Sequence, residues 1–115
     1  MISIKAATDK KHLYLSAEGH ADYMPGNDIV CAAVSALFCT LAINSQNAKL
    51  YPGDSFVVLS NNAENRAVYK AILSGLCAVA ESFSAHVRVE VGASADKINF
   101  FSEEMSNNMT FRNGG

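Results

Sequence analysis

Apolar and polar residues alternate with a period of two at the start of the chain, over residues 2–6 and again over residues 13–18. Such alternation is typical of a strand with one face in a core and the other in water. The polar stretch at residues 8–11 lies between the two runs and can form a turn. The pattern therefore predicts a β-hairpin that ends at Gly19.

A nearly uniform apolar segment covers residues 29–43, with only Ser35 and Thr40 as polar interruptions. A helix needs about 20 residues to span a bilayer, so this shorter segment predicts a buried helix instead. Its apolar residues lie on every side of the helix, and one sheet cannot cover them all. We therefore expect a second helix or a second subunit to cover the remainder.

The second half of the chain predicts another hairpin, helix and strand. The hairpin is expected over residues 47–51 and 55–59, which flank a Pro-Gly-Asp turn signal. Apolar residues at steps of three and four over 62–83 predict an amphipathic helix, which Asn61 and Glu64 can cap. The last strand is expected where valines alternate with charged residues, at Val87, Val89 and Val91.

The order β-β-α-β-β-α-β indicates an α+β fold. We expect a two-layer sandwich, with two helices on one face of a mostly antiparallel sheet. A chain of 115 residues is long enough for one domain, which we place at residues 1–92. Residues 93–115 are rich in Ser, Asn, Met and Glu and predict a flexible C-terminal tail, apart from the apolar residues 98–101.

Charge and cysteine content limit the partners and the compartment that we expect for this protein. The net charge is −2, the pI is near 5.8, and the basic residues form no cluster, which argues against a nucleic-acid or membrane-surface partner. The chain has three cysteines, an odd number, and its first residues predict a strand rather than a secretion signal. We therefore expect a cytoplasmic protein with reduced thiols.

The stretch that carries most chemistry is the turn-rich loop after Gly19 and the start of the apolar helix. His20 and Cys31 are eleven residues apart, and Asp28 is the best candidate for the helix N-cap. Cys31 then lies in the first helical turn, where backbone N–H groups favour a thiolate and could also form an oxyanion site. A thiolate beside an imidazole is the nucleophile and base of cysteine hydrolases.

Each of these residues also has a structural interpretation. Cys31 could equally be a buried apolar residue, and Asp28 could be a cap, an orienting group for His20, or both. His20, Asp28 and Cys31 could also hold a metal ion, but no paired cysteine or histidine spacing supports such a site, and we expect no cofactor. Cys39 and Cys77 lie in apolar helical runs and are expected in the core, while His12 and His86 are expected in solvent.

A further group of residues could line the site or contact a substrate, although solvated loop positions or a helix hydroxyl bonded to its own backbone would explain them as well. These are Gly19, Ala21, Asp22, Tyr23, Gly26 and Ser35.

The blocks Gly19–Asp22 and Asp28–Ala36 resemble the signature of the ribosomal-processing cysteine protease family, Prp, of Firmicutes and related bacteria. The resemblance extends more loosely over residues 1–92. It implies a cytoplasmic, homodimeric endopeptidase that removes a short N-terminal extension from a large-subunit ribosomal protein. It also implies that Cys31 is the nucleophile, that His20 is the general base, and that the loop between them admits the peptide.

The family's cleavage sites carry a Phe-Phe pair before a small residue, and relatives process phage proteins with similar sites. The tail is longer than in the family, and its Ile98–Ser102 resembles such a site. Either this segment enters the active site, as an inhibitor or as a self-cleavage site after Phe101, or it packs against the domain or adds an edge strand.

Two other functions fit parts of the pattern. A non-catalytic, dimeric module that binds peptides or the ribosome would need no pairing of His20 with Cys31. A redox sensor would need a second thiol near Cys31, but Cys39 is two helical turns away, about 12 Å.

Overall fold

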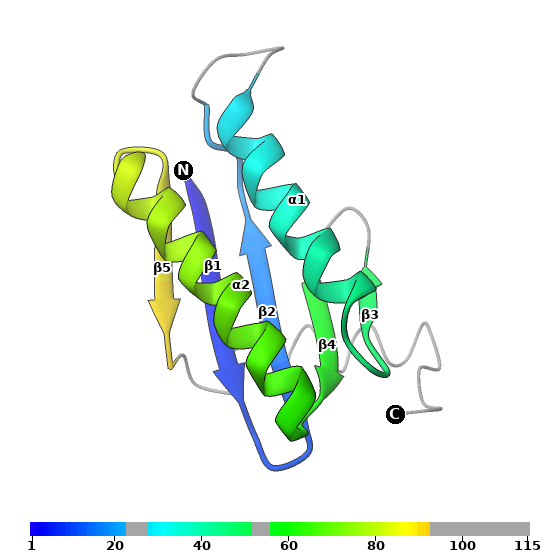
Figure 1. The fold of residues 1–115 in the computed structure, drawn as a ribbon. Coiled ribbons are helices and arrows are strands. Elements are labelled where there is room, and N and C mark those ends of the chain that lie inside the picture. Colours follow the sequence, from blue (N-terminus) through cyan, green and yellow to red (C-terminus); the bar gives the residue numbers. More distant parts are fainter. Residues whose placement is uncertain (23–27, 52–55, 93–115) are drawn as a thin grey trace.

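The computed structural model describes residues 1–22, 28–51 and 56–92, which form a five-stranded sheet and two helices. The elements are β1 (Ile2–Thr8), β2 (His12–Glu18), α1 (Ile29–Ile43), β3 (Lys49–Tyr51), β4 (Phe56–Ser60), α2 (Ala63–Ser82) and β5 (Val87–Val91). Both helices lie on one face of the sheet (Figure 1). The predicted α+β sandwich is therefore confirmed. Within the described ranges, neither helix is both long and apolar enough to cross a membrane.

The strands are ordered β3-β4-β2-β1-β5 across the sheet, and all neighbours are antiparallel except β1 and β5. In that parallel pair Ile2 lies opposite Val87. The N–H of Ile2 donates to the carbonyl of His86 at 2.8 Å. The last strand thus brings the segment before it against the first residues of the chain.

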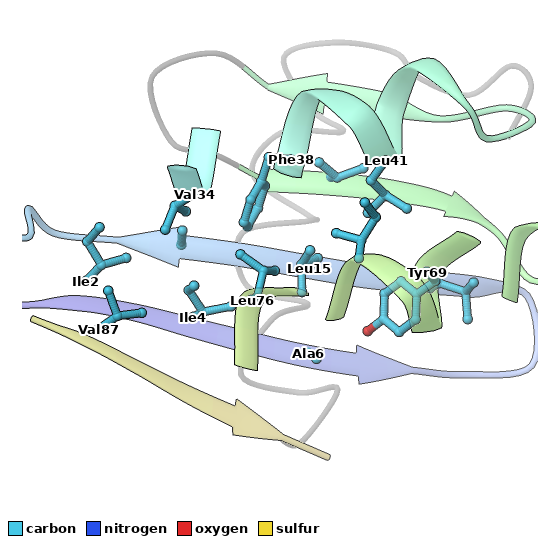
Figure 2. Close-up of a cluster of buried hydrophobic side chains, with 14 of the residues drawn as sticks. Ile2, Ile4, Ala6, Leu15, Val34, Phe38, Leu41, Tyr69, Leu76 and Val87 are labelled. Carbon is cyan, nitrogen blue, oxygen red and sulfur yellow. The ribbon is translucent and has the colours of Figure 1, made fainter. Parts of the chain in front are cut away.

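The main core lies between the sheet and the two helices (Figure 2). Strand residues such as Ile4 and Leu15 point toward the helices, while Phe38 of α1 and Leu76 of α2 point toward the sheet. The alternation in the sequence predicted the correct inner face of β1 and β2, and of β5 at Val87 and Val89, whereas Val91 is exposed.

Cys39 and Cys77 are exposed, so the prediction that both lie in the core was wrong. Each cysteine directly follows a buried residue, Phe38 in α1 and Leu76 in α2. One residue turns an α-helix by about 100°, which carries the next side chain away from the core. The nearly uniform apolar run of α1 gives no pattern from which the facing of Cys39 could be inferred, whereas Cys77 follows Leu76 of the amphipathic stripe of α2 and its outward facing was readable from the sequence.

The start of α2 also differs from the prediction, because the N-cap is Asn62 rather than Asn61. The Asn62 side chain accepts the N–H of Asn65 at 2.8 Å. Asn65 is itself buried and its amide donates to the carbonyls of Gln46 and Ser60. This buried amide ties the end of β4 and the α1–β3 connection to α2.

Candidate active site

Cys31 lies in the first turn of α1, as predicted, and packs half-buried against the main core. Asp28 is the N-cap: its Oδ1 accepts the N–H of Val30 at 2.9 Å and that of Cys31 at 3.0 Å. The capping role predicted for Asp28 is confirmed. The backbone of the cysteine is thus fixed by a residue only three positions away.

The same cap changes the chemistry expected at the helix start. The amides of Val30 and Cys31, which could have formed an oxyanion site, already donate to a carboxylate. That carboxylate also places a negative charge beside the turn that holds the thiol, where it opposes a second negative charge. These two amides are therefore not available to a substrate oxyanion while the cap is in place.

His20 lies on a short segment after β2, residues 19–22, which we call the His20 arm. Gly19 has φ +91°, and a Cβ there would collide with the carbonyl oxygen of Met1. The carbonyl of His20 accepts a hydrogen bond from the amino group of Met1 at 2.6 Å. The backbone of the arm is thus fixed while the His20 side chain remains exposed to solvent.

Ala21 anchors the middle of the His20 arm. Its side chain is 1% exposed and belongs to the main core. Its carbonyl lies 2.8 Å from Nδ1 of His86. A carbonyl oxygen can only accept, so Nδ1 of His86 carries the proton and donates it. The prediction that His86 is solvated was wrong, since its ring is half-buried against the arm.

Asp22 ends the arm with φ +54°, in the left-handed region. One of its carboxylate oxygens, Oδ2, lies 3.9 Å from the Met1 amino group, but the Asp22 side chain is 82% exposed. An ion pair this exposed stabilises the fold little. The arm is therefore held mainly by the hydrogen bonds to its two carbonyls and by the burial of Ala21.

The end of β2 and the start of α1 lie at the same end of the molecule (Figure 1). Within the described residues, no hydrogen bond joins the His20 ring to the Cys31 thiol or to the Asp28 carboxylate. Catalytic hydrogen bonds commonly tighten only in the complex with substrate. Tyr23 and Gly26 lie outside the described residues.

Ser35 lies one turn along α1 from Cys31 and is exposed on the helix surface. Its hydroxyl is available to a ligand bound along that surface. Among the described residues, no group of three His, Cys, Asp or Glu side chains could hold a metal ion.

Two contacts of the site were missed at the level of sequence: the Met1 amino group on His20 and the His86 ring on Ala21. His86 is 65 residues from Ala21 along the chain. The only signal that could have found it is the parallel pairing of β5 with β1, which sets His86 beside Met1.

Comparison with known proteins identifies a family and several solved structures that are similar to this chain. A family model described as "Cysteine protease Prp" matches residues 1–88. The fold is similar to that of an essential ribosomal processing protease Prp from S. aureus, solved with a covalently linked product peptide. That likeness has a TM-score of 0.65 and 22% identity, and it covers 79% of this chain and 99% of that one.

Two further solved structures are similar. The S. aureus protease in complex with a substrate peptide has a TM-score of 0.59 and 18% identity, covering 79% of this chain and 99% of that one. A protein from Streptococcus mutans also has a TM-score of 0.59, with 22% identity, covering 80% of this chain and 94% of that one. Among curated protein sequences, none matches this chain.

Proposed function

Because the chain belongs to the cysteine protease Prp family and is therefore a cysteine protease, we propose that Cys31 is its nucleophile and His20 its general base. The observation that carries this assignment is the half-buried Cys31 at the start of α1, at the end of the molecule where β2 leads into the fixed His20 arm. The other two cysteines, Cys39 of α1 and Cys77 of α2, are exposed.

In the proposed reaction His20 takes the proton from Sγ of Cys31, and the thiolate attacks the carbonyl carbon of the scissile peptide bond. The C–N bond then breaks as His20 gives its proton to the leaving amine, which leaves a thioester on Cys31. Water attacks the thioester and gives a proton to His20. The C–S bond breaks, the new carboxyl terminus leaves, and His20 returns the proton to Sγ.

Asp28 supports the nucleophile through its cap, and we retain it as the candidate to orient the His20 ring. The loop over residues 21–27 is the proposed gate for the peptide. Residues proposed to contact the substrate there and on α1 are Gly19, Ala21, Asp22, Tyr23, Gly26 and Ser35.

The proposed substrate is the N-terminal extension of a large-subunit ribosomal protein, cut after a Phe-Phe pair, or a phage structural protein with such a site. The name and bound peptides of the S. aureus relatives support a ribosomal substrate. The proposed compartment is the cytoplasm, because a nucleophilic thiol and two exposed thiols stay reduced there.

The proposed assembly is a homodimer through α1. Apolar residues remain exposed on α1 at steps of three and four: Ile29, Ala32, Ala36, Cys39 and Ile43. Ile29 is 56% exposed and Ile43 is 80% exposed. Helix α2 covers the other flank of α1, so a second copy would cover this stripe, and its small central residues allow close helix packing. Ala36→Arg should yield a monomer in sedimentation.

The decisive test is cleavage of a peptide that carries Phe-Phe before Ala or Ser. Wild-type protein should cut it after the second Phe, and both Cys31→Ala and His20→Ala should lose turnover. Cys39→Ser is the matched control, since it alters a thiol on the same helix that is remote from His20. Cleavage by Cys31→Ala would refute the proposed mechanism.

A second test uses the exposure of the other cysteines. In a Cys39→Ser/Cys77→Ser background Cys31 is the only thiol, so iodoacetamide reports on it alone. Rapid alkylation below neutral pH that slows in His20→Ala would support activation by His20. A rate equal to that of free cysteine would favour a binding module over an enzyme.

A further inference from the structure

The face of the sheet opposite the helices carries a buried apolar cluster, which we call the outer aromatic cluster. Its members are Ala7, Tyr14, Tyr51, Phe56 and Val58. The rings of Tyr14 and Phe56 stack with centroids 6.5 Å apart, and Tyr51 lies 5.7 Å from Phe56. Their exposures are only 6%, 1% and 4% for Tyr14, Phe56 and Tyr51.

Among the described elements, no helix or strand packs on the outer aromatic cluster. Both helices lie on the other face (Figure 1), and the same outer face carries the solvent-exposed Arg88 and Glu90 where it crosses β5. Alternate strand residues point to opposite faces, so Tyr14 faces away from the helices that cover Leu13 and Leu15. Aromatic residues on such a face are excluded from water only if another segment packs on them.

The remaining parts of the chain are 23–27, 52–55 and 93–115. The first connects β2 to α1, and α1 lies on the opposite face of the sheet. The second is Pro-Gly-Asp-Ser, which has no large apolar side chain. The third has 23 residues and contains Phe100, Phe101 and Phe111. Only the C-terminal segment has the length and the aromatic residues to cover the cluster.

The strand register brings that segment to the correct level of the sheet. Val91 lies opposite Ala6, and the N–H of Gly92 donates to the carbonyl of Ala6 at 3.1 Å. The chain thus leaves β5 level with the row that runs from Ala7 through Tyr14 to Val58.

The reach is also sufficient. From β5 to β4 is three strand spacings, about 14 Å. Six residues of extended chain, from Gly92 to Ile98, span about 20 Å. Residues 98–101 can therefore lie across β2 and β4 without strain.

We propose that residues 98–101 fold back onto the outer face of the sheet and cover the outer aromatic cluster, with Phe100 and Phe101 packed on the rings of Tyr14 and Phe56. The Tyr14 ring is held in one orientation for such packing, because its hydroxyl donates to Oδ2 of Asp9 at 2.9 Å. Burial and the neighbouring Asp9 raise the pKa of Tyr14 to about 12, so the ring stays neutral.

The sequence left open whether residues 98–102 enter the active site or pack against the domain, and this docking favours packing against the domain. The segment Ile98–Ser102 resembles a cleavage site, but on the outer face it lies across the sheet from α1 and Cys31. The chain then keeps its own Phe-Phe pair away from the catalytic thiol. The inference rests on burial and register and does not depend on the proposed protease mechanism.

The direct test places the photo-crosslinker p-benzoylphenylalanine at position 101 in the full-length Cys31→Ala chain, which cannot cut itself by the proposed route. We expect crosslinks within one chain to peptides that contain Tyr14 or residues 56–58. Crosslinks to residues 19–31, crosslinks only between two copies mixed as light and heavy isotopes, or none at all would each overturn the proposal.

A stability measurement provides an independent test. Phe100→Ala/Phe101→Ala should lower the melting temperature by about 5 °C or more and should increase binding of an apolar dye. The matched control is Asn107→Ala/Asn108→Ala, which alters the same tail without removing apolar area. Equal melting temperatures for the two variants would overturn the docking.

Discussion

The backbone of Cys31 is held by Asp28, three positions away, whereas the His20 arm is held by distant residues: Met1 lies 19 positions from His20, and His86 lies 65 positions from Ala21. The first kind of placement is a helix cap, which forms wherever the helix forms. In the second kind, Met1 reaches His20 across the β1–β2 hairpin, whereas His86 reaches the arm only once β5 has paired with β1. One half of the proposed dyad therefore depends on local sequence, and the other half on the completed tertiary fold.

The largest expected effect comes from Gly19→Ala. A side chain at φ +91° costs about 1–3 kcal/mol, and its Cβ would also push against the carbonyl of Met1. We expect a lower free energy of unfolding in urea and a loss of peptide turnover. Gly92→Ala is the matched control, because Gly92 also has positive φ but open space around it. Equal turnover in the two variants would show that the His20 arm need not be held.

The second largest effect is expected at Asp28, whose cap holds the backbone of Cys31. Asp28→Ala should destabilise the protein by about 1 kcal/mol through loss of the cap, measured by urea unfolding. Asp28→Asn keeps the cap and removes the charge, so its stability should stay close to wild type. Its Cys31 should alkylate faster at pH 6, because no carboxylate opposes the thiolate. Slower alkylation would indicate that the Asp28 charge helps His20 instead.

A smaller effect is expected at His86. Loss of one hydrogen bond of about 1 kcal/mol predicts a roughly fivefold fall in kcat for His86→Ala, with KM little changed. His86→Asn can donate from its amide to the Ala21 carbonyl and should recover most of kcat. If the two variants were equally impaired, His86 would serve packing rather than the position of the arm.

The smallest effect is expected for Cys77→Ser. The side chain is exposed on α2, so the free energy of unfolding should change by no more than about 0.5 kcal/mol. Thermal unfolding and peptide turnover should both match wild type. A change above 1 kcal/mol would place this thiol in an interface.

The parts of the fold that could be predicted from sequence are those set by nearby residues. Period-two alternation located β1 and β2, and the apolar run located α1 at residues 29–43 with Asp28 as its cap. Tyr14 alternates with core leucines and was read as facing water, yet it is buried. Its environment depends on which segment packs on the outer face, and alternation carries no information about that.

The contacts around His20 could not be predicted for a related reason. The prediction of β5 was correct, but five strands can be ordered in many ways. Only the parallel position beside β1 brings His86 to Ala21. Sequence patterns define the elements and their inner faces, whereas the neighbours of each strand follow from the packing of the whole sheet.

The parallel β1–β5 pair also determines when the last contact of the His20 arm can form during synthesis. The β1–β2 hairpin joins neighbouring segments and can form as soon as both have left the ribosome. The hydrogen bond from Ile2 to His86, and with it the His86 contact on Ala21, must wait until nearly the entire folded region has emerged. A nascent chain that stops short of β5 therefore carries Cys31 and its helix but lacks the His86 contact on the His20 arm. The last contact of the arm is therefore made only after β5 has been synthesised.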